Sequence, residues 1–293
     1  MQSRVSTEIP DDWPNKCASR AATLPPNTWH VQVLGAGPVV LLLHGTGASA
    51  HSWAPVASAL AECATVVVPD LPGHGFTNTW SNGLPTIPAV ASALSGLLSH
   101  LEIPAPTLIA GHSAGAALAV AMAHAAGPTP PTIVGFNPSL VPAPAVYTAL
   151  VAPWLGPLLQ SAPMLAIAGR VAEERRVIDW LLDSTASSLS ESQRAWYARL
   201  MRNPAHVAGA LALMQGWDVS ALLARVGVFA SPARFVVGTR DRWIPPAPLA
   251  GVLAAHFPSA QVRSWEGGHV LHEERPSDAT RLLAGLVAGA STR

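Results

Sequence analysis

Short apolar runs alternate with longer helical stretches along most of this chain. The runs predicted as strands are each bounded by glycine, proline or polar turns; they are Trp29 to Leu34, Val39 to Leu43, Thr65 to Pro69, Thr107 to Ala110, Thr132 to Phe136, Arg234 to Val237 and Gln261 to Trp265. Helices are predicted over Ser52 to Leu60, Pro88 to Leu101 and Ala114 to Ala126, and from Pro276 onward. This alternation predicts βαβ units, and hence an α/β fold with a mostly parallel sheet flanked by helices.

The alternation breaks after Asn137-Pro138. From Ser139 to about Pro232 no strand pattern is evident, whereas residues 171–182, 190–201 and 204–214 have helical character. We therefore predict a helical cap that interrupts the core. The expected division is an N-terminal extension over residues 1–27, a core over 28–138 and 232–293, and a cap or lid over 139–231.

The first part of the predicted cap carries no charge. No Asp, Glu, Lys or Arg occurs between Ile103 and Gly169, and prolines interrupt the stretch after Ser139, so we expect no membrane-spanning helix there. Two hypotheses remain open. In the first, the segment is a lid whose inner face lines an apolar substrate pocket with Tyr147, Trp154, Leu155 and Met164. In the second, its outer face also docks on a membrane or a partner.

A candidate nucleophile follows the strand that ends near Ala110. Gly111-His112-Ser113-Ala114-Gly115 has the pattern G-x-S-x-G, in which the glycines let a strand and a helix pass closely while the serine takes strained dihedral angles at the edge of the sheet. Ser113 is the predicted nucleophile. A serine hydroxyl is a weak nucleophile at neutral pH, so it needs a base and a group that orients the base.

Two downstream loops supply candidates for these roles. Asp241 follows the strand that ends at Val237, and His269 follows the strand that ends at Trp265. Because loops at the carboxyl ends of parallel strands open on one edge of the sheet, we expect Ser113, Asp241 and His269 to converge. His269 is the predicted general base and Asp241 the group that orients it.

Other residues compete for the same roles. Asp241 has the alternative of pairing with Arg240 or Arg242 as an ordinary loop carboxylate. His272 lies close to His269, but we expect it to pack against the following helix. We assign no catalytic role to the elbow residue His112 or to the histidines in helical stretches, His100 and His124.

The loop after Leu43 is a candidate oxyanion hole. His44-Gly45-Thr46-Gly47 is rich in glycine and directly follows a continuous apolar strand, so its backbone N–H groups can point at a developing negative charge. We predict that the N–H groups of Thr46 and Ala114 form the hole. The alternative is that the loop is only a tight turn.

Composition narrows the function classes. The chain is 49% apolar and 12% charged, with 17 basic and 17 acidic residues, so no nucleic acid partner is expected. Cys17 and Cys63 form no disulfide framework by spacing, and the first 26 residues lack the apolar core of a secretory signal. A cytoplasmic location is the default expectation. We predict no cofactor and no metal, because no dinucleotide fingerprint or metal-ligand spacing is present.

These motifs together resemble the α/β-hydrolase superfamily over nearly the whole chain. The segments that carry the resemblance are Leu43-His44-Gly45, Asp70 to Phe76, Gly111 to Gly115, Gly238 to Pro245, and Gly268-His269 to Pro276. The resemblance implies the α/β-hydrolase fold. Relatives with dehalogenase or epoxide hydrolase chemistry use an aspartate nucleophile, and Ser113 argues against those reactions here.

A narrower resemblance is to the magnesium chelatase accessory protein family of bacteriochlorophyll biosynthesis. It rests on Asp12-Trp13-Pro14-Asn15 with Ser19-Arg20, Trp29 to Val33, Leu42 to Ala48, His51-Ser52-Trp53, and Asn203 to Ala210. It implies a tetrapyrrole as the apolar small molecule, magnesium chelatase subunits as partners, and a peripheral position at the photosynthetic membrane. It does not by itself identify a reaction.

Three functions are therefore open. The first is a serine hydrolase that cleaves an ester, thioester or related acyl bond of an apolar substrate. The second is a noncatalytic tetrapyrrole-binding helper of magnesium chelatase, since fold and function are separable. The third is hydrolysis of a carbon–carbon bond with the same serine arrangement.

Overall fold

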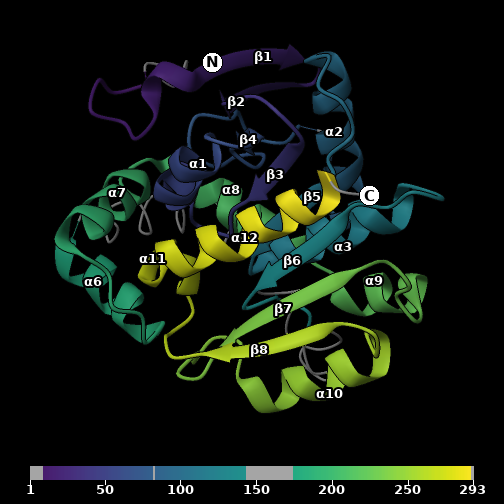
Figure 1. Ribbon diagram of the computed structural model, residues 1–293. Coiled ribbons are helices and arrows are strands. Elements are labelled where there is room, and N and C mark those ends of the chain that lie inside the picture. Colours follow the sequence, from purple (N-terminus) through teal and green to yellow (C-terminus); the bar gives the residue numbers. More distant parts are fainter. Residues whose placement is uncertain (1–8, 82, 143–173, 292–293) are drawn as a thin grey trace.

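An eight-stranded sheet forms the centre of the molecule (Figure 1). The computed structural model describes residues 9–81, 83–142 and 174–291. The strands are β1 (Ser19–Leu24), β2 (Asn27–Leu34), β3 (Val39–Leu43), β4 (Thr65–Pro69), β5 (Leu108–His112), β6 (Thr132–Phe136), β7 (Ala233–Gly238) and β8 (Gln261–Trp265). Their order in the sheet is β1-β2-β4-β3-β5-β6-β7-β8.

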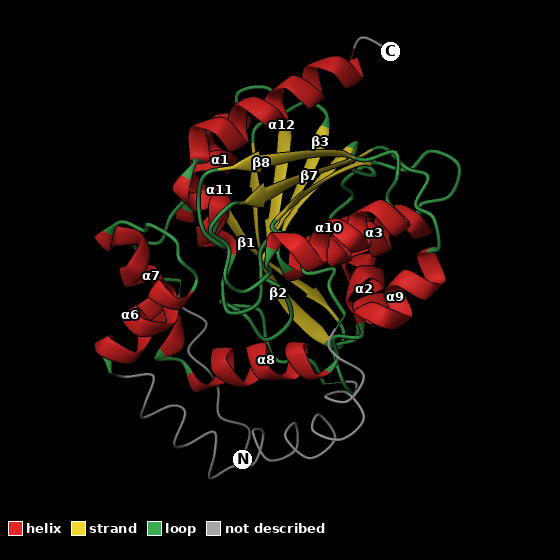
Figure 2. Cartoon of the chain, turned by 90° about the horizontal axis from the view of Figure 1, so that it is seen from below, coloured by secondary structure: helices red, strands yellow, loops and turns green. Residues whose placement is uncertain are grey.

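The described helices lie around this sheet. They are α1 (Ala54–Leu60), α2 (Ile87–His100), α3 (Ala114–Ala125), α6 (Arg175–Ser184), α7 (Glu191–Met201), α8 (Pro204–Gln215), α9 (Val219–Val226), α10 (Pro246–His256), α11 (Leu271–Glu274) and α12 (Pro276–Ser291). Figure 2 shows α1 and α12 on one side of the strands, and α2, α3, α9 and α10 on the other. The molecule therefore has the three layers of an α/β protein.

The parallel part of the sheet brings distant loops to one edge. Strands β4, β3, β5, β6, β7 and β8 pair in parallel, whereas β1 and β2 pair antiparallel and β2 runs antiparallel to β4. In register, Leu43 lies opposite Gly111, and Gly238 lies opposite Trp265. The loops that follow β3, β5, β7 and β8 therefore start at the same edge.

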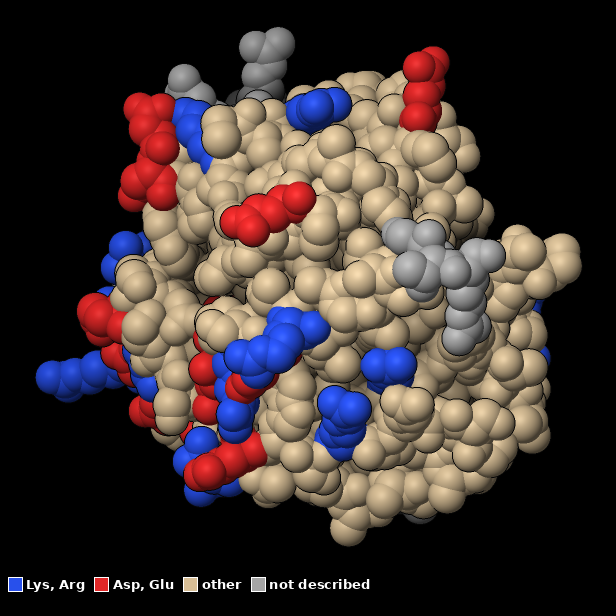
Figure 3. Space-filling view, in the orientation of Figure 1, with Lys and Arg blue, Asp and Glu red and all other residues tan. Residues whose placement is uncertain are grey.

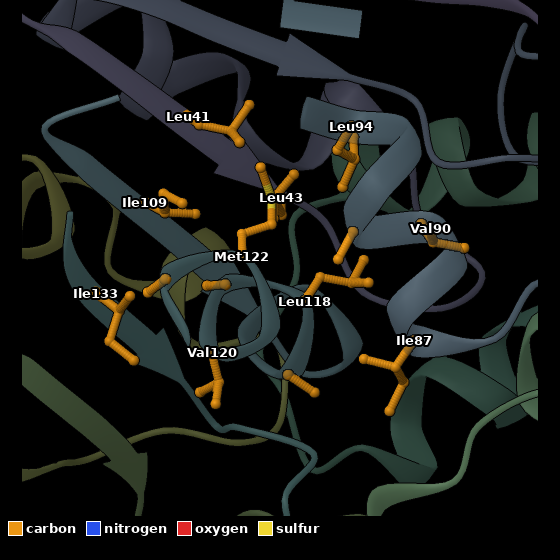
Figure 4. Packing of buried hydrophobic residues seen from close by; sticks show 14 of the residues in the cluster. Leu41, Leu43, Ile87, Val90, Leu94, Ile109, Leu118, Val120, Met122 and Ile133 are labelled. Carbon is orange, nitrogen blue, oxygen red and sulfur yellow. The ribbon is translucent and has the colours of Figure 1, made fainter. Parts of the chain in front are cut away.

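Both faces of the central strands are buried. Along β3, Val40 and Leu42 belong to a core that α1 and α12 cover, whereas Leu41 and Leu43 belong to a core shared with α2 and α3. Figure 4 shows the second core, where Leu118 of α3 lies between the strands and α2. Because successive side chains of a strand point to opposite faces, burial of both faces requires the unbroken apolar run that the sequence shows.

The described part of the cap region packs on the loops at the carboxyl edge. Ala48 and Val270 share an apolar cluster with residues of α6 and α7 and of the segment between them; these are Ile178, Leu182, Leu189, Tyr197 and Ala198. Helix α7 begins at a capping box, in which Ser190 accepts a hydrogen bond from the Gln193 backbone and the Gln193 side chain binds the Ser190 backbone. Two helices of the predicted cap are thus anchored to the core.

On the face shown in Figure 3, many charged side chains gather on the side that carries α6, α7 and α11, and several of them belong to the cap helices. Those of the cap helices form ion pairs with one another: Arg194 pairs with Asp179 and Asp183, and Arg175 pairs with Asp179 and Glu191.

Among the described helices, none is by itself long and apolar enough to cross a membrane. Helices α8 and α9 reach that length only as a pair, which is bent by 50°.

The predicted fold class is confirmed, and the boundaries of the predicted strands lie within two residues of the observed ones. Among the described elements, one strand and three α-helices were not predicted: β1, α9, α10 and α11. Strand β1 falls within the segment that we set apart as an N-terminal extension, yet it pairs with β2 at the edge of the sheet. Only Ala22 among its six residues is buried, so this edge strand carries little apolar signal.

Candidate active site

Ser113 lies at the turn between β5 and α3 with φ 50° and ψ −113°. A positive φ costs a residue with a side chain about 1–3 kcal/mol, so the surroundings must enforce it. A Cβ on Gly111 would lie 2.2 Å from the carbonyl carbon of Gly115, and a Cβ on Gly115 would lie 2.2 Å from the carbonyl oxygen of Leu43. Strand β5, helix α3 and the end of β3 therefore approach too closely for a side chain at either glycine. Ser113 itself remains partly exposed.

Asp241 and His269 form a buried pair on the loops after β7 and β8. Asp241 Oδ2 lies 2.8 Å from His269 Nδ1, and the two residues are only 4% and 3% exposed. Asp241 Oδ1 accepts hydrogen bonds from the backbone N–H groups of Trp243 and Ile244, at 2.8 and 2.9 Å. The carboxylate is thus held on both oxygens. It orients the imidazole with Nδ1–H toward Asp241, which leaves the lone pair of Nε2 for a reacting group.

The competing residues have other partners. Arg240 was an alternative partner for Asp241. Its Nη2 lies instead 3.6 Å from Glu274 Oε2. His272 is fully buried, its Nε2 lies 3.1 Å from Ser52 Oγ, and its ring centroid lies 4.2 Å from that of Trp53. Burial lowers the pKa of His272 well below its ordinary value, so this imidazole stays neutral.

Two side chains that were assigned no role hold the backbone of His269. Its carbonyl oxygen lies 2.7 Å from Asn137 Nδ2 and 2.9 Å from His112 Nε2. Asn137 Nδ2 also donates to the Gly268 carbonyl at 2.8 Å, and its Oδ1 accepts from the Gly238 N–H at 2.6 Å. Asn137 therefore ties the loop of the candidate acid to the loop of the candidate base. The available signal in the sequence is its place directly after the predicted strand Thr132 to Phe136, at the edge of the sheet where these loops start.

The loop after β3 passes beside the elbow. A Cβ on Gly45 would lie 3.1 Å from Ser113 Cβ, so the following residue, Thr46, is close to the serine. Within the described part of the chain, neither the N–H of Thr46 nor that of Ala114 has a hydrogen-bond acceptor. Unpaired N–H groups beside a nucleophile are what an oxyanion requires. The role of these two groups stays a prediction.

The serine and the imidazole are not hydrogen bonded to each other in the described structure. Ser113 follows His112, whose ring centroid lies 4.8 Å from that of His269, so the two candidate residues are on neighbouring loops. In unliganded enzymes this bond is often long and tightens when substrate binds. The catalytic roles of Ser113, His269 and Asp241 therefore stay predictions.

An aromatic side chain lies at the rim of this site. The Trp243 ring centroid is 5.3 Å from that of His269, with an interplanar angle of 34°, and Trp243 is 45% exposed. Its Nε1 donates to Ser184 Oγ at the end of α6, at 3.0 Å. Trp243 thus connects the candidate base to the cap. The predicted pocket residues lie outside the described residues; they are Tyr147, Trp154, Leu155 and Met164.

Several further histidines are buried near this edge of the sheet. Burial lowers the pKa of His44 to about 3 and that of His74 to about 4, so both are neutral at neutral pH. The buried histidines serve as hydrogen-bonding groups. His44 Nε2 accepts from the Leu71 N–H at 2.9 Å, and another buried histidine, His206, accepts through Nδ1 from the Gly75 N–H at 3.0 Å. Across residues 9–81, 83–142 and 174–291, no three His, Cys, Asp or Glu side chains are arranged to hold a metal ion.

The chain belongs to the alpha/beta hydrolase family, whose pattern matches residues 40–281. It is 35% identical over 269 residues to the "Magnesium-chelatase 30 kDa subunit" of Rhodobacter capsulatus, which covers 90% of this chain and 93% of that protein. It is 24% identical to a "Pimeloyl-[acyl-carrier protein] methyl ester esterase" of Stenotrophomonas maltophilia, over 89% of this chain and 97% of that protein. An alpha/beta hydrolase fold protein from Burkholderia ambifaria superposes with a TM-score of 0.74 at 20% identity, covering 91% of this chain and 97% of that chain. The predicted superfamily and the narrower resemblance are both confirmed.

Proposed function

We propose that this protein is a serine hydrolase that cleaves an ester, thioester or related acyl bond of an apolar substrate. The observation that carries the proposal is the 2.8 Å hydrogen bond between buried Asp241 and His269, at the sheet edge where Ser113 is held with a positive φ. Membership of the alpha/beta hydrolase family supports it, as does similarity to an esterase along most of the chain. A buried carboxylate–imidazole pair that only stabilised the fold would not require a partly exposed serine with a strained backbone at the same edge of the sheet.

The proposed reaction has two halves. Ser113 Oγ attacks the acyl carbon as His269 Nε2 takes its proton, Asp241 stabilises the resulting imidazolium, and the N–H groups of Thr46 and Ala114 bind the oxyanion. The bond to the alcohol or thiol then breaks, and the leaving group takes the proton from Nε2. Water attacks the acyl-Ser113 intermediate in the same manner, which releases the carboxylic acid and restores the serine.

An apolar substrate agrees with the rim of the site. Trp243 offers a partly exposed aromatic face directly over His269, and the cap helices meet the core through an apolar cluster. The relative that is named as a magnesium chelatase subunit favours a tetrapyrrole substrate and action at the chelatase step, with chelatase subunits as partners. A propionate ester of such a ring is a bond of the required class.

A fluorophosphonate probe tests the catalytic serine. Wild-type protein should be labelled at Ser113, and Ser113→Ala should lose that label while remaining folded. Ser99→Ala is the matched control, because Ser99 is exposed on α2 and donates only to the Ser95 carbonyl. Absence of labelling at Ser113 in folded wild-type protein would exclude an active triad.

A noncatalytic helper of magnesium chelatase is the second candidate, and the 35% identical relative favours it. This alternative requires that porphyrin binding and stimulation of magnesium insertion persist in Ser113→Ala. Quenching of tryptophan fluorescence by protoporphyrin IX measures the binding, and a chelatase assay measures the insertion. Loss of stimulation in Ser113→Ala with unchanged porphyrin binding would favour the enzyme.

Peripheral membrane contact through the outer face of residues 139–169 stays a prediction. Deletion of that segment should abolish flotation with liposomes if the segment docks there. Unchanged flotation would remove this hypothesis and leave the lid hypothesis standing.

A further inference from the structure

A second Ser-His-Asp relay lies outside the candidate active site. Ser19 Oγ lies 2.9 Å from His30 Nε2, and His30 Nδ1 lies 2.7 Å from Asp70 Oδ2. Ser19 begins β1, His30 lies in β2, and Asp70 directly follows β4. The relay joins the same atoms, in the same order, as a catalytic triad, and here both hydrogen bonds are present.

The acid of this relay is held in its ionised form. Asp70 is fully buried, yet Oδ1 accepts from the Ala50 N–H at 2.7 Å, and Oδ2 accepts from the Phe76 N–H at 2.9 Å in addition to facing His30. Burial alone would raise the pKa of Asp70, but the facing His30 imidazole and the Phe76 N–H outweigh it and hold this pKa well below its ordinary value. The carboxylate therefore orients the imidazole with Nδ1–H toward Asp70, so that Nε2 presents its lone pair to Ser19.

The serine of this relay is oriented as well. Gln32 Nε2 donates to Ser19 Oγ at 3.3 Å and to the Pro14 carbonyl at 2.7 Å, so the amide group is anchored. Because Oγ accepts from Gln32, its own hydrogen is directed at His30 Nε2. Ser19 itself is only partly buried, whereas His30 is 3% exposed.

The relay is distinct from the Ser113 site. In the sheet, β2 and β5 are separated by β4 and β3. With neighbouring strands about 4.8 Å apart, the two sites are about 14 Å apart across the sheet. Ser19 therefore cannot share the imidazole of His269.

We propose that Ser19 is a second nucleophile, activated by His30 and Asp70, that accepts acyl groups from activated esters. Its Oγ bonds to the carbonyl carbon, the bond from that carbon to the leaving oxygen breaks, and the Oγ proton passes to His30 Nε2 and then to the leaving group. Water attack on acyl-Ser19 returns the serine and releases the acid. A base of this kind raises reactivity about 10²- to 10⁴-fold over an unassisted hydroxyl.

Acetylation by p-nitrophenyl acetate tests this proposal in the full-length Ser113→Ala protein, followed by mass spectrometry of the labelled peptides. Ser58 is the internal control, because it is an exposed serine of α1 whose hydroxyl bonds to Asn15 Oδ1 instead of an imidazole. We expect Ser19 to be acetylated at least tenfold faster than Ser58. The label should disappear in Ser19→Ala, and His30→Gln should slow it at least tenfold while leaving Ser58 unchanged.

Acetylation of Ser19 no faster than that of Ser58, or unchanged acetylation in folded His30→Gln, overturns the proposal. If His30→Gln fails to fold, the pH dependence of the rate of Ser19 acetylation in Ser113→Ala decides between the outcomes. A rate that levels off as pH rises indicates an imidazole base, whereas a rate that keeps increasing tenfold per pH unit indicates an unassisted alkoxide and overturns it. Because Ser113 is absent throughout, failure of this proposal does not bear on the proposed hydrolase function.

Discussion

Asn137 Nδ2 lies 2.7 Å from the carbonyl oxygen of His269, although the two residues are separated by 132 positions in the chain. The same amide group reaches Gly268 and, through Oδ1, the N–H of Gly238. Asn137 is fully buried and has φ 44°, so its backbone is fixed as well. It is therefore a positioning residue for the loops that carry both candidate catalytic partners of Ser113.

Replacement of Asn137 by Ala should lower kcat for p-nitrophenyl butyrate hydrolysis by about 10- to 100-fold with KM nearly unchanged. It leaves buried carbonyl and N–H groups unpaired, which costs about 1–3 kcal/mol each, and lets His269 drift from Asp241. Steady-state kinetics and the rate of fluorophosphonate labelling measure the effect. Asn203→Ala is the control, since Asn203 caps α8 and should affect stability only. A stable Asn137→Ala protein with wild-type kcat would exclude this positioning role.

Replacement of Asp241 by Asn should reduce kcat by about 10⁴-fold while the fold persists. An amide at this position no longer selects the imidazole tautomer with Nδ1–H and does not stabilise the imidazolium. The matched control is Asp218→Asn, because Asp218 Oδ1 only caps the Ala221 N–H of α9. Comparable activity of the two variants would contradict the assignment of Asp241.

The contribution of Glu273 to the free energy of unfolding should fall as pH rises from about 4.5 to 8. This residue is 5% exposed, and burial raises its pKa from 4.5 to about 8 while Tyr197 on α7 donates to its Oε1. Between these two pH values Glu273 binds its proton more strongly in the folded state than in the unfolded state, so its contribution is lost with increasing pH, at up to about 1.4 kcal/mol per pH unit. The buried histidines act in the opposite sense below about pH 6.5, because burial lowers their pKa values. The difference in stability between wild type and Glu273→Gln isolates Glu273, and denaturant titrations at pH 5, 7 and 9 measure it.

Glu273→Gln imitates the protonated carboxyl, so its stability relative to wild type should increase with pH, with the largest gain at pH 9. Glu62→Gln changes the same charge at an exposed position and should leave the wild-type slope intact. Parallel profiles for wild type and Glu273→Gln would mean that Glu273 is ionised in the folded protein at all three pH values.

Replacement of Gly115 by Ala should destabilise the protein by about 3 kcal/mol or more. The new Cβ would lie 2.2 Å from the Leu43 carbonyl oxygen and would separate the elbow from the end of β3. Gly251→Ala is the matched control: Gly251 lies within α10 with no atom close to its Cβ position, so alanine should raise stability by about 0.5–1 kcal/mol. Thermal denaturation of both variants provides the comparison. Equal stability of Gly115→Ala and wild type would show that strand and helix can move apart.

Much of the core was predictable because its signals are local. The run Val39 to Leu43 is apolar at every position since both faces of β3 are covered, and Gly111 is required by its contacts with Gly115 and Ala116, which are close in sequence. The N-terminal β1 was missed because an edge strand with exposed residues resembles a polar loop. Helices α9 and α10 were missed as well: α9 is short, and α10 contains two prolines and a glycine.

The sequence by itself determined the fold class and the candidates Ser113, Asp241 and His269, because strand periodicity and turn chemistry are properties of short segments. Only the tertiary structure decided which buried groups pair. The order of strands in the sheet brings Asn137 to His269, joins Ser19 to His30 and Asp70, and buries Glu273 under α7. Hydrogen-bond partners and pKa shifts depend on these long-range neighbours, and no local pattern of residues encodes them.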